Sequence, residues 1–378
     1  MRRSRQTVQI GYNRVFRLDG GIMDHRLDNR LAGVSPPAWP GILARISEID
    51  EFKGWWRGRH SPPPSYLGGL RKKSVALSAA ASLGVGWTGL PRPVGDTASG
   101  LPPALSERLR RASAARYAHL VNAVFDGPGK IPLSRETILG FHAELMRYAP
   151  GDPALRGAWR SLHDRSEYLP RHTAESIALR PAAPESIPSA MDALLRWTTT
   201  RLDSGGAHPL LVTACFLLVF LAIRPFASGN GRTSRLLTQL LLLRGGYGYL
   251  PYASLDKVIA ERKVEYYLAL RKSQSSLHLP RPDMGPWFLA FLEALRLQAR
   301  ELRQALAPLP AESRLSGKQE GALALFGRHR EITNRLVSAE LGIPRETAKQ
   351  VLNRLVALHL VSRAGAGRAV RYRKAEPA

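Results

Sequence analysis

The twelve residues from 224 to 235 are Arg-Pro-Phe-Ala-Ser-Gly-Asn-Gly-Arg-Thr-Ser-Arg, and they separate two apolar segments. The segment before them, Leu210 to Ile223, is nearly all apolar, and the segment after them, Arg232 to Leu243, has its apolar residues at helical spacing. We therefore predict two helices joined by a glycine-rich turn. At 14 residues the first apolar run is shorter than the roughly 20 that cross a bilayer, so it predicts a buried central helix.

The turn between these two helices has the chemistry of a phosphate cradle. Gly229 and Gly231 leave the backbone N–H groups around Asn230 open at a helix N-terminus, where the helix dipole favours an anion. Arg232 and Arg235 follow, one helical turn apart. A short glycine-rich turn often only ends one helix and begins the next, but the two arginines favour phosphate or nucleotide binding here.

Helical spacing of apolar residues recurs along most of the chain. We predict further helices over residues 41–56, 66–83, 106–125, 134–148, 187–202, 254–273 and 285–307. Residues 169–181 differ, since Ile177 and Leu179 lie in a stretch with a proline at each end, and they predict a short hairpin. The fold class is therefore mostly α.

Residues 224–235 resemble the signature of the Fic family, His-Pro-Phe-x-Asp/Glu-Gly-Asn-Gly-Arg-x-x-Arg, and match seven of its nine specified positions. The resemblance extends to residues 46–55, the hairpin, residues 208–210 and residues 265–267, and it covers most of residues 40–373. It implies a Fic-type helical bundle with a short β-hairpin flap that can hold a protein partner. The activity that it implies is protein AMPylation from ATP.

Two positions depart from this signature. Arg224 stands where the family has the histidine that withdraws a proton from the target hydroxyl, and a guanidinium cannot take a proton at neutral pH. Ser228 stands where the family has the acidic residue that holds Mg²⁺, and a neutral hydroxyl is a much weaker ligand for that ion. We therefore predict a pseudoenzyme that requires no cofactor, binds ATP weakly and does not hold Mg²⁺ well. Arg224 is either a surface or salt-bridged arginine without a further role, or a third cation of the cradle.

The self-inhibiting helix of the family is degenerate as well. Its motif is Ser-x-x-x-Glu-Gly, in which the Glu pairs with the last arginine of the signature. The best match begins at Ser82, and Gly86 replaces the Glu. Asp96 is the only acidic residue from 74 to 105, so no shifted alignment supplies one. We expect the inhibitory Glu to be absent from a chain that has no AMP transfer to inhibit.

Residues 316–378 have the pattern of a winged helix-turn-helix. We predict helices over 318–326, 333–341 and 345–358, and then a β-wing from residues 360–363 and 369–373. The third helix has an apolar stripe, and its opposite face carries side chains suited to base edges and phosphates: Arg345, Glu346, Lys349, Gln350 and Asn353. The wing carries Arg363, Arg368, Arg371 and Arg373. Double-stranded DNA is the predicted partner, and protein contact or dimerisation is the alternative use of such a module.

The charge of the chain agrees with a polyanionic partner. Lys and Arg outnumber Asp and Glu by 55 to 30, a formal charge of +25. The excess is densest at the two ends, with 14 against 6 in residues 1–73 and 12 against 5 in residues 316–378. Nucleic acid is the default polyanion, although an organism that favours arginine on all its protein surfaces would give a similar excess.

These patterns divide the chain into five parts. We predict a basic, poorly ordered arm, an N-terminal helical region with the degenerate inhibitory motif, the Fic core, a linker and the winged helix, over residues 1–40, 41–105, 106–307, 308–315 and 316–378. Cys215 is the only cysteine, so no disulfide forms within the chain, and the basic N-terminus lacks the apolar core of a signal peptide. We expect a cytoplasmic protein that does not bind a membrane and that can form a homodimer.

Three functions fit the sequence. The first is a DNA-binding regulator with a vestigial or ligand-sensing Fic domain. The second is a working Fic-type nucleotidyltransferase that uses another base, for which His172 in the hairpin and His208 before the central helix are the nearest candidates. The third is a pseudoenzyme that binds a protein along its hairpin.

Overall fold

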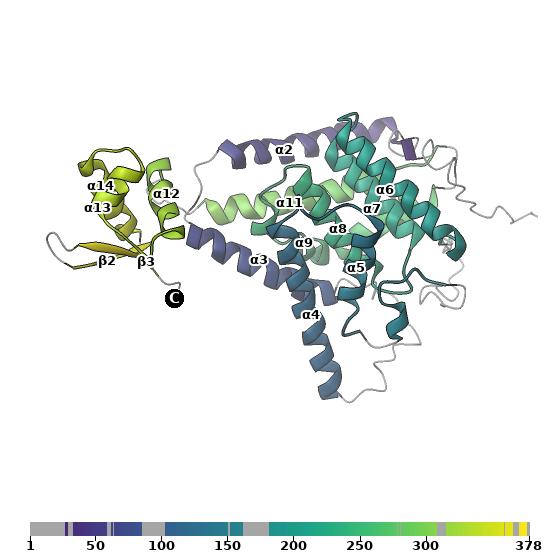
Figure 1. Ribbon diagram of the computed structural model, residues 1–378. Coiled ribbons are helices and arrows are strands. Elements are labelled where there is room, and N and C mark those ends of the chain that lie inside the picture. The colour runs from purple at the N-terminus through teal and green to yellow at the C-terminus, as the bar shows by residue number, and fades with distance from the viewer. Residues whose placement is uncertain are drawn as a thin grey trace, which may run out of the picture.

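The computed structural model describes residues 27–28, 33–58, 62, 64–84, 103–149, 152–161, 181–277, 279, 281–307, 315–358, 360–365 and 370–375. In this part of the chain helices dominate, and the strands form one small sheet near the C-terminus (Figure 1). Two separate hydrophobic cores are present, a large one up to Leu306 and a small one from Leu315 onward.

The larger unit consists of helices. Its α-helices are α2 (Trp39–Gly58), α3 (Pro64–Gly84), α4 (Pro103–Asp126), α5 (Arg135–Leu145), α6 (Ile187–Asp203), α7 (Pro209–Ile223), α8 (Asn230–Arg244), α9 (Leu255–Glu261), α10 (Lys263–Ser275) and α11 (Gly285–Leu306). Short 3₁₀ turns lie at η1 (Pro36–Ala38), η3 (Pro153–Leu155), η4 (Pro184–Ser186) and η5 (Leu250–Tyr252).

Helix α7 is the centre of this unit. Every residue from Leu210 to Phe220 is buried, which confirms the predicted central helix. Helices α6, α8, α10 and α11 all contact it, and α2 lies along α11 (Figure 1). A helix that is apolar on all sides must be covered on all sides, because each buried apolar side chain contributes about 1.5–3 kcal/mol to stability. The ends of α7 and α8 are therefore held firmly in place.

The predicted helix over residues 254–273 is divided in two. Arg262 leaves the helical conformation, with φ −110° and ψ 31°, and separates α9 from α10. Helix α9 contacts α3 and α11, whereas α10 packs against α11 and α7. The prediction of one continuous helix was wrong because tertiary packing outweighs local helical propensity at this point.

Part of the segment predicted to be a poorly ordered arm contacts the helical body. Leu27 is fully buried, and Asp28 accepts hydrogen bonds from Trp197 Nε1 at 2.8 Å and Arg201 Nε at 2.9 Å. Residues 33–38 are also described and lead into α2. The predicted hairpin over residues 169–181 lies, apart from Pro181, outside the described residues.

The smaller unit has three helices on one sheet. Its elements are α12 (Gly317–Ala324), η7 (Leu325–Gly327), β1 (Glu331–Ile332), α13 (Asn334–Glu340), α14 (Arg345–Ala357), β2 (Val361–Ala364) and β3 (Arg371–Lys374). The sheet is antiparallel with the strand order β1-β3-β2. The three helices and the two later strands lie where the sequence predicts them. Strand β1 was not predicted, because two residues are too few to show an alternating pattern.

None of the helices in the described ranges combines the length and the apolar character that crossing a membrane would need.

Candidate functional site

The glycine-rich turn joins the C-terminus of α7 to the N-terminus of α8. It begins at Arg224, which caps α7 in the left-handed conformation with φ 50° and ψ 65°. Apart from glycines, Arg224 is the only described residue with positive φ. This conformation costs a residue with a side chain on the order of 1 kcal/mol, so the surroundings must impose it.

Arg160 holds this end of α7. It is buried, and its Nε donates to the carbonyl oxygen of Arg224 at 2.8 Å. Its Nη2 donates to the carbonyl oxygens of Ala182 and, at 3.4 Å, Ile223, and its backbone N–H donates to the carbonyl oxygen of Pro225 at 2.9 Å. A helix C-terminus exposes carbonyl groups without partners, and a cation satisfies them well. Arg160 lies in no sequence motif, so no local pattern indicated this role.

Asn230 fixes the shape of the turn itself. Its Oδ1 accepts the backbone N–H of Phe226 at 3.0 Å, and its Nδ2 donates to the carbonyl oxygen of the same residue at 2.7 Å. Phe226 is buried, and its ring stacks on that of His142 with centroids 3.7 Å apart and planes 4° apart. The turn is therefore a rigid loop held from both sides.

His142 of α5 is the histidine that the fold brings to the turn. Its Nδ1 accepts the backbone N–H of Gly157 at 3.0 Å, so the proton lies on Nε2, which donates to the carbonyl oxygen of Ser228 at 3.1 Å. Burial lowers the pKa of His142 to about 4, and the charge of Arg232 acts in the same direction. Both ring nitrogens are occupied by backbone groups, so His142 positions the loop and has no lone pair to offer as a general base.

The N-terminus of α8 is the place where the sequence predicts an anion cradle. Gly229 precedes it with φ 75°, and a Cβ at this position would lie 2.9 Å from Met146 Sδ and 3.2 Å from the His142 ring, so only glycine fits. No side chain caps the first turn of α8. Arg232 lies beside it with its Nη2 3.2 Å from Met146 Sδ, and burial together with the charge of Arg235 lowers its pKa. The first N–H groups of α8 and the guanidinium of Arg232 can thus receive one anion.

Arg235 is turned away from this cradle. It is buried, and its Nε donates to Asp256 Oδ1 at 2.7 Å, while its Nη2 faces the carbonyl oxygen of Ser82 at 3.5 Å. The sequence placed Arg235 among the phosphate-binding residues. The structure pairs it with a protein carboxylate, because α9 places Asp256 against the inner side of α8.

Comparison with known proteins now identifies the architecture around the turn. Residues 132–242, from just before α5 to the end of α8, match the model of the Fic/DOC family. The chain contains a Fic domain. The protein adenylyltransferases Fic of Drosophila sechellia and Drosophila melanogaster are each 31% identical over 118 residues, which are 31% of this chain and 21% of theirs. The matched stretch therefore spans about a fifth of the length of these relatives.

Solved structures share the fold. A Fic domain containing signaling protein from Bacteroides thetaiotaomicron is 18% identical and has a TM-score of 0.51, with 71% of this chain and 98% of that chain covered. The predicted fold class, a mostly helical Fic-type bundle, is thus confirmed.

The degenerate inhibitory motif lies next to the Fic signature. Ser82 is in the last turn of α3, and its carbonyl oxygen is the one that faces Arg235. Its own Oγ donates to the carbonyl oxygen of Ala79 at 2.8 Å. Gly86 lies outside the described residues. The end of α3 thus contacts Arg235 through a backbone carbonyl, and the carboxylate on Arg235 comes from α9.

The structure also separates His208, one of the two alternative bases, from the Fic turn. His208 lies at the N-terminus of α7 and Arg224 at the C-terminus, and a helix of 15 residues is about 22 Å long. His208 Nε2 instead bonds Asp50 Oδ2 at 2.9 Å, which joins α2 to α7. His172 lies outside the described residues. Within the described part of the chain, no three His, Cys, Asp or Glu residues are grouped as metal ligands.

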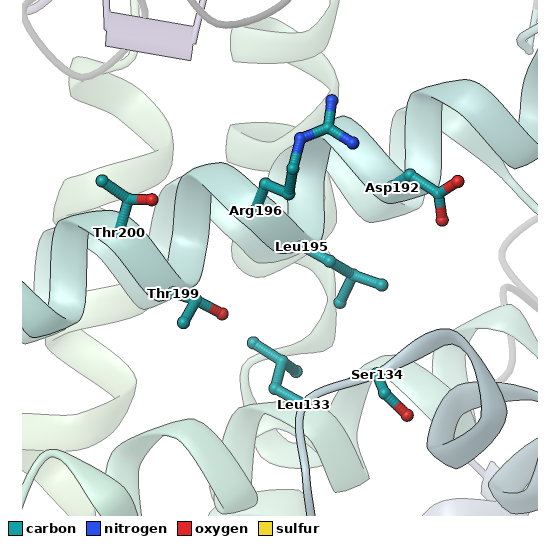
Figure 2. Close-up of a pocket in the computed structure, with 7 residues that line it drawn as sticks. All are labelled: Leu133, Ser134, Asp192, Leu195, Arg196, Thr199 and Thr200. Carbon is teal, nitrogen blue, oxygen red and sulfur yellow. The ribbon is translucent and has the colours of Figure 1, made fainter.

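A shallow cavity of about 460 Å³ lies beside α6, away from the signature turn. In Figure 2, Leu195 and Thr199 of α6 lie opposite Leu133 and Ser134. Asp192, the carboxylate at its edge, is paired with Arg135 at 3.2 Å. No residue of the signature lines this cavity, so we assign it no role in the chemistry of the Fic domain.

The C-terminal unit exposes most of the residues predicted to bind DNA. On α14 these are Arg345, Lys349, Gln350 and Asn353, and on the strands they are Arg363, Arg371 and Arg373. Arg368 lies outside the described residues. The strand arginines differ among themselves: Arg373 Nε bonds Glu331 Oε1 at 2.7 Å and Arg371 Nη1 lies 3.4 Å from Glu331 Oε2, whereas Arg363 opposes Tyr372 and shares its face of the sheet.

Proposed function

We propose that this chain is a DNA-binding regulator whose Fic domain no longer transfers nucleotides. The proposal rests on one observation, the amphipathic character of α14. The side of the helix that faces the small core is apolar, with Ala348, Val351, Leu352 and Leu355 all buried. The opposite side presents Arg345, Lys349, Gln350 and Asn353 to solvent, and such side chains bond base edges and phosphates in the major groove.

The surroundings of α14 support contact with a polyanion. Residues 316–378 hold 12 Lys and Arg against 5 Asp and Glu. Arg330 and Arg335 are exposed near the start of α13, in addition to the arginines of β2 and β3. On this proposal the module acts as a winged helix, in which α14 contacts the bases and the basic hairpin contacts the DNA backbone. The proposal includes a cytoplasmic location, in which the chain has access to DNA.

The geometry of the Fic domain supports the loss of transfer. Arg224 occupies the position of the catalytic histidine, and its backbone is held by Arg160 at the end of α7. His142 is close to the turn, but both its ring nitrogens are occupied. Ser228 offers a neutral hydroxyl where the family has a carboxylate for Mg²⁺, so we expect the metal to be held poorly.

A residual phosphate site is the part of the Fic domain that we expect to remain in use. The rigid loop, the uncapped N-terminus of α8 and Arg232 are all preserved, and they suit a weakly bound phosphate compound such as ATP or a simpler anion. On this proposal, a ligand bound at this site regulates the protein without any catalysis.

The test of the DNA proposal is a binding measurement at two salt concentrations. Fluorescence anisotropy with a labelled duplex of random sequence is recorded for the full chain and for a chain that ends at residue 307, at roughly 50 and 200 mM salt. We expect the full chain to bind at low salt and to lose roughly 10³-fold in affinity at high salt if six or so phosphates are contacted. The shortened chain is expected not to bind. Equal binding by both chains, or no salt-sensitive binding by the full chain, would leave protein contact as the use of the C-terminal unit.

A further inference from the structure

Asp256 is the centre of a buried polar cluster behind the Fic turn. It is completely buried and lies in α9. Its Oδ1 accepts from Arg235 Nε at 2.7 Å and from the hydroxyl of Tyr117 at 2.8 Å, and its Oδ2 accepts from Gln239 Nε2 at 3.0 Å. These three donors come from α8 and α4, so one carboxylate ties three helices together.

Arg235 lies beside the helical turn that carries the cradle. It follows Arg232 by one helical turn, and its Nη1 is 3.4 Å from the position that a Cβ on Gly231 would take. The guanidinium thus lies against the first turn of α8, the same turn whose N–H groups form the anion site. Arg235 does not contribute to that site because its guanidinium hydrogen-bonds Asp256 and faces the carbonyl oxygen of Ser82.

We infer that Asp256 acts as an internal counter-anion that removes Arg235 from the cradle and thereby restricts the cradle to a compact, single phosphate group. A polyphosphate chain that reached Arg235 would have to displace a carboxylate held by three donors, and it would meet the negative charge of that carboxylate in a buried setting. A single phosphate on the N–H groups and Arg232 needs no such displacement. The inference rests on the residual phosphate site proposed above, and it names the ligand class of that site.

The structure also shows why the counter-charge for Arg235 comes from α9 and not from α3. Helix α3 reaches Arg235 only with the backbone carbonyl of Ser82, and a carbonyl oxygen does not neutralise a buried guanidinium. Asp256, 21 positions after Arg235, supplies the charge. Asp256 is therefore a specificity-determining residue for the cradle.

The experiment compares two inorganic anions by titration calorimetry on the full chain. Orthophosphate represents the compact ligand and tripolyphosphate the extended one. In Asp256→Asn we expect tripolyphosphate to bind roughly 10- to 100-fold more tightly than in the wild type, because Arg235 gains the freedom to form a charge-assisted bond. The affinity for orthophosphate is expected to stay within about twofold, since that anion does not reach Arg235.

Two further variants exclude other causes of a gain. Asp50→Asn removes the same unit of negative charge, but far from the cradle, where Asp50 bonds Tyr247 and His208. It is expected to leave the affinity for tripolyphosphate unchanged. Asp256→Asn combined with Arg235→Gln is expected to lose the gain. An unchanged affinity for tripolyphosphate in a folded Asp256→Asn chain overturns the inference, and so does an equal gain in Asp50→Asn.

The double variant also covers the case in which Asp256→Asn alone does not fold, because it removes both buried charges together. It is then expected to bind both anions as the wild type does. A marked loss of affinity in it would make Arg235 a ligand of the native site and overturn the inference. Failure of the proposed phosphate site itself gives a different result: the wild type binds no orthophosphate, whatever Asp256→Asn does with tripolyphosphate.

Discussion

The Nε of Arg160 donates to the carbonyl oxygen of Arg224 across 2.8 Å, so one buried arginine fixes the backbone of another at the position where Fic proteins carry their base. The same guanidinium bonds the carbonyl oxygens of Ile223 and Ala182. Buried hydrogen bonds thus hold the backbone of Arg224 and of the residue before it.

Arg160→Ala is expected to lower the free energy of unfolding by about 2–4 kcal/mol, because it leaves buried carbonyl groups without a donor. Urea denaturation followed by circular dichroism measures the change. The control is Arg244→Ala, since Arg244 also donates to two carbonyl oxygens, those of Pro128 at 3.1 Å and Ile131, but is exposed. We expect it to cost less than about 1 kcal/mol. Equal losses in the two variants would contradict a special role for Arg160.

The purified chain is expected to transfer no AMP to itself or to added proteins at millimolar ATP and Mg²⁺. A guanidinium does not accept a proton at neutral pH, and the loss of a general base costs about 10²- to 10⁴-fold in rate. Incorporation of label from α-³²P-ATP is the measurement. The matched variant is Arg224→His with Ser228→Asp, which returns a base and a carboxylate to the same rigid loop and should make labelling detectable. Labelling of the wild type at the level of this variant would refute the prediction.

Acid should destabilise the Fic domain through His142. The folded protein keeps this side chain neutral down to its pKa of about 4, whereas the unfolded chain binds a proton near the ordinary value of 6.5. The unfolded state therefore binds more protons in this window, and about 3 kcal/mol of stability is lost as the pH falls from 6.5 to 4.

Urea midpoints across this pH range, for the wild type and for His142→Gln, isolate the contribution of His142. We expect the variant to be less stable at pH 7 and its stability to change less as the pH falls. If His142→Gln retains the pH dependence of the wild type, the titrating group is another one.

The two classes of predicted DNA contact in the C-terminal unit should respond differently to mutation. Arg363→Ala is expected to weaken binding to all DNA sequences and to lower the salt slope by about 1, as the loss of one phosphate contact does. Lys349→Ala and Asn353→Ala are expected to cost about 1–3 kcal/mol on a duplex selected from a random pool and to spare random DNA. Arg244→Ala, in the Fic domain, is the charge control. Identical effects at Arg363 and Lys349 would contradict the placement of α14 against the bases.

Glu331 should oppose DNA binding. It bonds Arg371 and Arg373, and the hydrogen bond from Arg373 lowers its pKa, so it remains charged at neutral pH. We expect Glu331→Gln to bind DNA more tightly and with a salt slope steeper by about 2, because both arginines become available to phosphates. Anisotropy titrations over a range of salt concentrations measure both quantities. Weaker binding by this variant would mean that Glu331 orients the two arginines for DNA and does not compete with it.

Periodic features were predictable from the sequence because they are repeated. The apolar run over 210–223 and the stripe of α14 each contain several residues that agree on one buried face, and the structure has both helices there. The structure shows why residue 229 is glycine, since its φ is 75° and a Cβ there would lie 2.9 Å from Met146 Sδ. The continuous helix over 254–273 failed as a prediction because no residue in it marks the change of packing partner at Arg262.

The sequence by itself therefore determined the helical class, the Fic signature with its two changed positions, and the polar face of α14, since all of these are properties of residues close together in the chain. Only the tertiary structure decided what surrounds the signature. Arg160, His142 and Asp256 are 64, 86 and 21 positions away from the residues that they contact in it. The partner of a buried polar group is chosen by the packing of distant helices, because any donor or acceptor brought within reach can satisfy it, and no local pattern records which one will be.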